Sequence, residues 1–131
     1  MLKRSALVVF ALIPFLACAR IEERLGVAVY PGAKYDQEET ELLRDSLGVR
    51  GAAYRTGDAI DDVIAFYRKQ QGLVFLNIGG SKGLARFKKD DTGADVLVQN
   101  PWKNPKTGAI EKDTLILIFK RDEKSGPAVS L

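Results

Sequence analysis

Five consecutive apolar residues near the C-terminus, Leu115-Ile116-Leu117-Ile118-Phe119, constrain the fold more than any other feature of the sequence. Side chains alternate along a strand, so Leu115, Leu117 and Phe119 point to one face and Ile116 and Ile118 to the other. A strand with one solvated face would alternate apolar and polar residues. The run therefore predicts a central strand in a sheet that is covered on both faces.

Two helices are available as covers. Residues 58–71 form the clearer one, because apolar side chains recur on one face at Ile60, Val63, Ile64 and Tyr67. Asp58 is expected to cap this helix, with Asp61 three residues on, and Gly72 to end it. A shorter helix is expected over residues 37–47, with acids in its first turn, Leu42, Leu43 and Leu47 on one face and Gly48 as its C-cap.

The remaining apolar segments read as short strands separated by turns. They are Val27–Tyr30, Ala52–Thr56, Leu73–Ile78, Leu84–Lys89 and Asp95–Gln99. These elements predict a single α+β domain with a mostly antiparallel sheet. The 58–71 helix is expected to pack on one face of the sheet, and the 37–47 helix is expected to cover the other face. If the shorter helix does not reach, the bare face is the expected binding surface, for a second copy, an envelope partner or a lipid-like ligand.

The N-terminus has the layout of a secretory signal peptide. Lys3 and Arg4 precede an apolar run over residues 6–17, and small residues follow. The run is shorter than the roughly 20 apolar residues that a membrane-spanning helix needs. Phe15-Leu16-Ala17-Cys18 resembles a bacterial lipobox, in which the cysteine receives a diacylglycerol and becomes the new N-terminus. Ordinary cleavage after Ala19 is the alternative.

The lipobox reading makes Cys18, the only cysteine of the chain, the lipid-attachment residue. It divides the chain into a signal peptide (1–17), a lipid-anchored tether (18–26), an α+β domain (27–121) and a loose tail (122–131). Ala19 rather than an aspartate follows the cysteine, and by resemblance this favours an outer-membrane lipoprotein facing the periplasm. Without acylation, the protein would be soluble in the periplasm or secreted.

Missing residue types exclude several chemistries. The chain contains no histidine, and no cysteine follows Cys18. Disulfides within the domain are therefore excluded, as are zinc, copper and haem sites built on these ligands and catalysis by Ser-His-Asp or Cys-His sets. Without Lys3 and Arg4, 18 of the 20 basic residues remain against 17 acidic ones, so the charge is poor evidence for a nucleic-acid partner.

Residues that suggest a site on first inspection have simpler readings. Gly79-Gly80-Ser81-Lys82-Gly83 lacks the spacing of a phosphate-binding loop and reads as a hairpin turn. The acids Asp90, Asp91 and Asp95 lack the spacing of a calcium loop, and Asp58, Asp61 and Asp62 suit a helix start. We therefore predict no catalytic, cofactor-binding or metal-binding residues.

Two weaker signals remain open. Tyr30 and Trp102 lie at strand ends beside prolines, where aromatic rings either line a ligand pocket or plug the core. A basic strand face could contact anionic lipid headgroups, although a solvated surface is the simpler reading; its members would be Arg86, Lys88, Lys103, Lys106 and Lys120.

Three segments resemble a group of small bacterial exported proteins and lipoproteins with a YPGA-type strand end. They are Val29–Ala33, Ala53–Asp58 and Val63–Tyr67. The resemblance spans most of residues 27–119 and implies the α+β fold and an envelope location, but no activity.

The sequence thus predicts a lipid-anchored envelope protein that acts as a non-catalytic binding or assembly module. Its expected partners are the membrane and an envelope protein or a second copy. Two alternatives stay open: a small envelope enzyme that uses carboxylates or Lys and Tyr side chains, with acids such as Asp95 and Glu111 converging in a cleft, and a soluble periplasmic ligand-binding protein.

Overall fold

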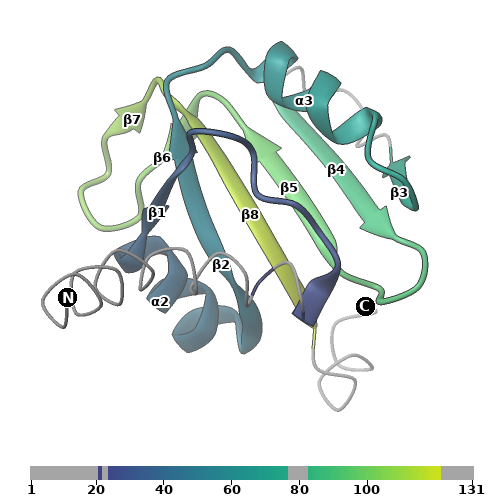
Figure 1. The fold of residues 1–131 in the computed structure, drawn as a ribbon. Helices are drawn as coiled ribbons and strands as arrows, with labels where there is room; N and C mark the ends of the chain where they lie inside the picture. The colour runs from purple at the N-terminus through teal and green to yellow at the C-terminus, as the bar shows by residue number, and fades with distance from the viewer. Residues whose placement is uncertain (1–20, 22–23, 77–82, 122–131) are drawn as a thin grey trace, which may run out of the picture.

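The computed structural model describes residues 21, 24–76 and 83–121. The signal peptide and lipobox with Cys18, residues 79–82 of the glycine-rich turn and the tail after residue 121 lie outside these described residues. Six strands form one antiparallel sheet in the order β1-β2-β8-β5-β4-β3 (Figure 1). They are β1 (Lys34–Asp36), β2 (Val49–Thr56), β3 (Leu73–Leu76), β4 (Leu84–Lys89), β5 (Asp95–Gln99) and β8 (Thr114–Arg121). The α+β prediction is confirmed.

The apolar run lies in β8, between β2 and β5 at the centre of the sheet. Ile116 is opposite Tyr54 on β2 and Val98 on β5, so one face of the sheet carries these side chains. Ile116 and Ile118 are fully buried on that face. Leu115 and Phe119 are buried on the other face, but Leu117 is only partly buried. The prediction of a central strand covered on both faces is confirmed for four of its five residues.

Helix α3 (Ile60–Arg68) covers the Ile116 face. Its Val63 and Tyr67 are fully buried and belong to the same core cluster as Ile116 and Ile118. The helix is shorter than the predicted 58–71 segment, and the predicted cap is wrong: Ala59 is the N-cap and no side chain caps the helix. Asp58 is engaged elsewhere, because its carboxylate accepts a hydrogen bond from Tyr30 and its carbonyl accepts one from Thr114.

The segment before β1 completes this layer. It runs across the face of the sheet (Figure 1) and forms no strand, so the predicted strand Val27–Tyr30 is wrong. Side chains satisfy its carbonyls in place of a ladder: Tyr67 donates to Ala28 at 3.0 Å and Thr92 to Leu25 at 2.8 Å. Leu25 lies in the predicted tether (18–26), but it is buried in the core, so the folded domain includes at least this residue.

Helix α2 (Gln37–Leu47) lies on the opposite face and has the predicted bounds. Asp36 caps its start by accepting the Glu39 N–H at 2.9 Å, and Gly48 ends it in the left-handed conformation. Thr40 Oγ1 accepts the Ala53 N–H at 2.8 Å and so ties the helix to β2. No helix in the described part of the chain has the length and apolar character required to cross a lipid bilayer.

Two further strands, β6 (Trp102–Lys103) and β7 (Ile110–Glu111), pair with each other outside the main sheet. They follow β5 and precede β8 in the chain, so the small sheet projects from the end of the main one (Figure 1). This position places Trp102 beside Leu43 and Leu115 in the core cluster under α2.

Candidate functional site

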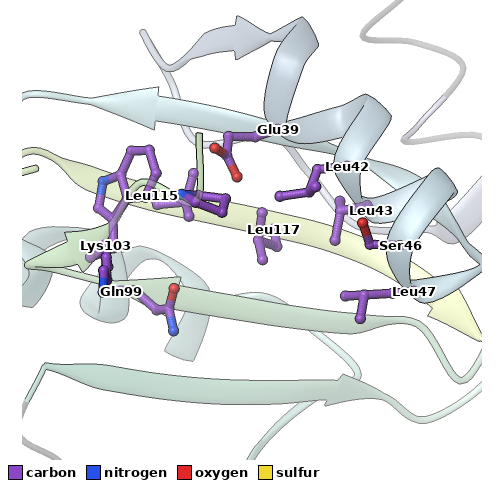
Figure 2. A pocket seen from close by; sticks show the side chains of 11 residues that line it. Glu39, Leu42, Leu43, Ser46, Leu47, Gln99, Lys103, Leu115 and Leu117 are labelled. Carbon is purple, nitrogen blue, oxygen red and sulfur yellow. The ribbon is translucent and has the colours of Figure 1, made fainter. Parts of the chain in front are cut away.

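A groove of about 340 Å³ opens between α2 and the sheet. Helix side chains form one wall, β8 forms the floor, and β5 and the β6 region form the other wall (Figure 2). The lining is mostly apolar and consists of Glu39, Leu42, Leu43, Ser46, Leu47, Gln99, Trp102, Lys103, Pro105, Leu115 and Leu117. The groove explains why Leu117 is only partly buried: α2 covers β2 and the edge of β8 but does not extend over β5.

Glu39 is the only acidic residue in this lining. Its side chain points from α2 towards Leu115 (Figure 2) and retains only 9% of its exposure. Within the described part of the chain, its carboxylate has no hydrogen-bond or ion-pair partner; the one bond of this residue is donated by its backbone N–H to Asp36. No fully buried side-chain oxygen in the described residues lacks a hydrogen-bond partner, so this unpaired carboxylate keeps contact with solvent through the groove and is accessible to a ligand.

An ion-pair cluster holds the aromatic wall of the groove. Arg55 Nε lies 2.6 Å from Asp113 Oδ2, and its guanidinium also contacts Asp36 at 3.5 Å and Glu111 at 3.6 Å. The same guanidinium lies 4.9 Å from the centre of the Trp102 ring, and Trp102 Nε1 donates to Asp113 Oδ1 at 3.1 Å. The indole is therefore fixed by contacts to both its face and its N–H before any ligand arrives.

The environment of the groove shifts the pKa values of two carboxyl groups in opposite directions. Burial raises the pKa of Glu39 above its ordinary value, and nearby negative charges on Asp36, Glu38 and Glu111 add to the rise while Arg55 opposes it. Burial also raises the pKa of Asp113, but hydrogen bonds from Arg55 and Trp102 outweigh this and leave the pKa below its ordinary value. The ionised form of Asp113 is thus stabilised by the fold, whereas ionisation of Glu39 destabilises the fold.

We expect the free energy of unfolding of Glu39→Gln to increase relative to that of the native protein as pH rises from about 4 to about 7. A raised pKa means that the folded state binds more protons than the unfolded state in this range, so Glu39 lowers the free energy of unfolding as it ionises. Glutamine does not titrate. Urea unfolding of both proteins at each pH measures the difference, and a difference that is constant or changes in the opposite direction would contradict the assignment.

Of the two aromatic residues that the sequence singles out, Trp102 lines the groove and Tyr30 does not. Tyr30 packs edge-to-face on Phe66 of α3 at 5.3 Å, on the other side of the sheet. Its hydroxyl donates to Asp58 Oδ2 at 2.6 Å, which raises the pKa of Tyr30 to about 12. Of the two interpretations, Trp102 therefore lines a pocket, whereas Tyr30 packs against the edge of the core.

The predicted acidic groups are not brought together. Asp90 and Asp91 lie in the turn after β4, whereas Asp95 is buried and accepts two hydrogen bonds from Arg86. The described residues contain no cluster of three or more acidic side chains arranged to hold a metal ion.

Asp95 and Glu111 do not converge either. Asp95 lies opposite Phe119, and Glu111 contacts Arg55, which lies opposite Leu115. These positions are four residues apart along β8, about 13 Å at strand spacing. The cleft that the enzyme alternative requires is therefore not formed by this pair.

The proposed basic face is also divided. Arg86 is paired with Asp95, and Lys106 lies 2.6 Å from Glu38. Alternation along β8 places Lys120 on the Ile118 face, whereas Lys103 lines the groove on the opposite face. Lys88 lies on the same face as Arg86 and the groove. Because Arg86 and Lys106 are paired and Lys120 lies on the other face, the five residues form no continuous cationic surface.

Sequence reasoning did not identify Glu39 as a site residue. It read the acids of the 37–47 segment as first-turn residues, and Glu39 does occupy that position. Its burial depends on how α2 rotates against the sheet.

Comparisons with protein-family models, with curated proteins and with solved structures find no match for this chain.

Proposed function

We propose that the protein is an exported, lipid-anchored component of the bacterial envelope whose domain binds a partner through the groove between α2 and β8. The observation that carries the binding proposal is the apolar groove, into which the largely buried Glu39 side chain directs a carboxylate that has no partner among the described residues. Binding sites of this type combine a mostly apolar lining with a few convergent polar groups. The anchoring proposal rests on Cys18 at the end of the apolar N-terminal run.

The anchor is tested by Cys18→Ser in the expressing bacterium. The variant should lose metabolic labelling with a fatty-acid analogue and keep its leader, because the thiol is the acceptor of the diacylglycerol. Labelling and mobility on a denaturing gel measure both effects. Maturation of the variant to the native size, with continued partition into membranes, would instead support cleavage after Ala19.

The binding function is tested by photo-crosslinking in intact cells. A photoreactive phenylalanine analogue replaces Leu47, which lines the groove and is 65% exposed. The control places the analogue at Ala65, which is exposed on α3 at the other face of the sheet. We expect a discrete crosslinked product from position 47 and none of that size from position 65.

A second variant shows whether such a product depends on the groove. Ser46 is exposed on the groove rim, so Ser46→Trp fills the opening without disturbing the core. This substitution should remove most of the product formed from position 47. Equal products from both positions, or a product that survives the obstruction, would contradict the groove as the binding surface.

A further inference from the structure

We propose that the groove binds an extended segment of a partner protein in which a lysine or arginine is flanked by aliphatic residues. This inference rests on the proposed binding function and names the chemistry of its ligand. The basic residue would meet Glu39, and the flanking aliphatic side chains would contact Leu115 and Leu117 on the groove floor.

Charge complementarity identifies the basic residue. Glu39 is nine-tenths buried, faces the groove and has no side-chain partner in the described part of the chain. The surrounding side chains do not neutralise it: five carboxylates at this end of the groove stand against three cations, and two of the cations are occupied in ion pairs. The carboxylates are Asp36, Glu38, Glu39, Glu111 and Asp113, and the cations are Arg55, Lys103 and Lys106. An anionic ligand group would be repelled here, whereas a cation would complete the missing pair.

The polar groups of the walls favour a peptide over a lipid-like chain. Ser46 lines the helix side, and Gln99 and Lys103 line the opposite side (Figure 2). None of these three side chains has a hydrogen-bond partner within the described residues. Ser46 and Lys103 are exposed and Gln99 is half-buried, so water hydrates these groups in the free protein. A peptide that covers them offers an N–H and a C=O at each residue in place of that water, whereas an alkyl chain offers neither. The wall side chains would hydrogen-bond to the main chain of the peptide, because β8 on the floor is already paired with β2 and β5.

The size of the groove limits the segment to a few residues. Glu39 and Leu47 are eight residues apart on α2, which is about 12 Å along a helix. An extended peptide covers this distance with about four residues. Because Glu39 lies at one end of this span, a test peptide with a central basic residue and two leucines on each side can lay one leucine pair along the groove in either chain direction.

The test uses the full chain in phospholipid nanodiscs and three synthetic pentapeptides, each acetylated and amidated. Every peptide has two leucines on each side of a central lysine, glutamine or glutamate. Trp102 is the only tryptophan of the chain and lines the groove, so its fluorescence reports binding directly. We expect the lysine peptide to bind about ten-fold more tightly than the glutamate peptide, since hydrogen bonds to charged groups are the stronger class.

Variants of α2 locate the source of this preference. Glu39→Gln should reduce the ratio of the lysine to the glutamate affinity to about three-fold or less, because the charged partner is removed. Glu41→Gln is the matched control: it removes a carboxylate from the same helix outside the groove lining and should leave the ratio unchanged. If Glu39→Gln lowers stability, Leu117→Gln supplies a second test, because a polar floor should weaken all three leucine-rich peptides.

Each outcome decides the proposal. Equal affinity for the three peptides, or a preference that persists in Glu39→Gln, overturns it. Binding of dodecylamine in place of the lysine peptide also overturns it and identifies a lipid-like cation as the ligand. If the peptides fail while position 47 still gives its groove-dependent crosslink, the proposed function stands and only the ligand class is wrong. If both fail, the groove is not a binding site.

Discussion

Replacing Ile116 and Ile118 with alanine together is expected to remove most of the stability of the domain. Both side chains are fully buried at the centre of the sheet, against α3. Each truncation should lower the free energy of unfolding by about 2–5 kcal/mol, because it removes buried methyl groups and leaves a cavity. A small domain is stable by only about 5–15 kcal/mol, so the pair removes most of that margin. Urea unfolding, followed through Trp102 fluorescence and far-UV circular dichroism, measures the loss.

The other face of β8 provides graded controls. Leu115→Ala should be nearly as costly as a single isoleucine truncation, because Leu115 is 4% exposed. Leu117→Ala should cost less, since this side chain borders the groove and already contacts solvent. Leu47→Ala, at an exposed position, should change stability by about 0.5 kcal/mol or less. Equal losses at Leu117 and Ile116 would mean that the groove is closed in solution.

Elements whose signals lie within their own sequence could be predicted well. Helix α2 and strands β4 and β5 have the predicted bounds, because caps, turns and alternation are local features. The alternation in β4, with Ala85 and Phe87 buried, is also confirmed. The centrality of β8 followed from its composition alone, since no other position in a sheet covers both faces of an apolar strand.

Elements that depend on tertiary pairing could not be predicted. Strands β1, β6 and β7 contain two or three residues each, too few for a periodic pattern, and they exist only because a partner strand is adjacent. The segment at Val27 has the composition of a strand, yet it pairs with neither edge strand, β1 or β3, and packs across a face instead. The groove also depends on tertiary packing. It forms because α2 does not extend over β5, and no local sequence signal specifies the position of α2 relative to β5.

Asp95 shows how pairing across strands changes the role of a residue. Sequence reasoning grouped it with the solvated turn acids Asp90 and Asp91. The β4–β5 hairpin instead places it on the face that carries Arg86, where its side chain is buried and Arg86 donates to Oδ1 at 2.8 and 3.1 Å. Both donors reach the same oxygen from a neighbouring strand, so the contact depends on the register of the hairpin.

Arg86→Met is therefore expected to be the most destabilising substitution of a charged residue in the described part of the chain. It leaves the Asp95 carboxylate buried without its partner, a change that costs about 3–5 kcal/mol for buried pairs. Because Arg86 keeps about a third of its exposure, solvent screens part of this charge, and we expect about 3 kcal/mol, near the lower end of that range. The free energy of unfolding from urea titration measures the loss.

The double variant Arg86→Met with Asp95→Val separates a buried charge from lost packing. Valine suits a strand and removes the carboxylate, and apolar replacement of a buried ion pair is often neutral or stabilising. The second substitution should therefore restore most of the stability that the first removes, and the double-mutant cycle should show a strong favourable coupling. A loss below about 1 kcal/mol for Arg86→Met would place the pair in the range of ordinary surface ion pairs. A loss that Asp95→Val does not restore would show that Arg86 stabilises the sheet through its aliphatic stem rather than its charge.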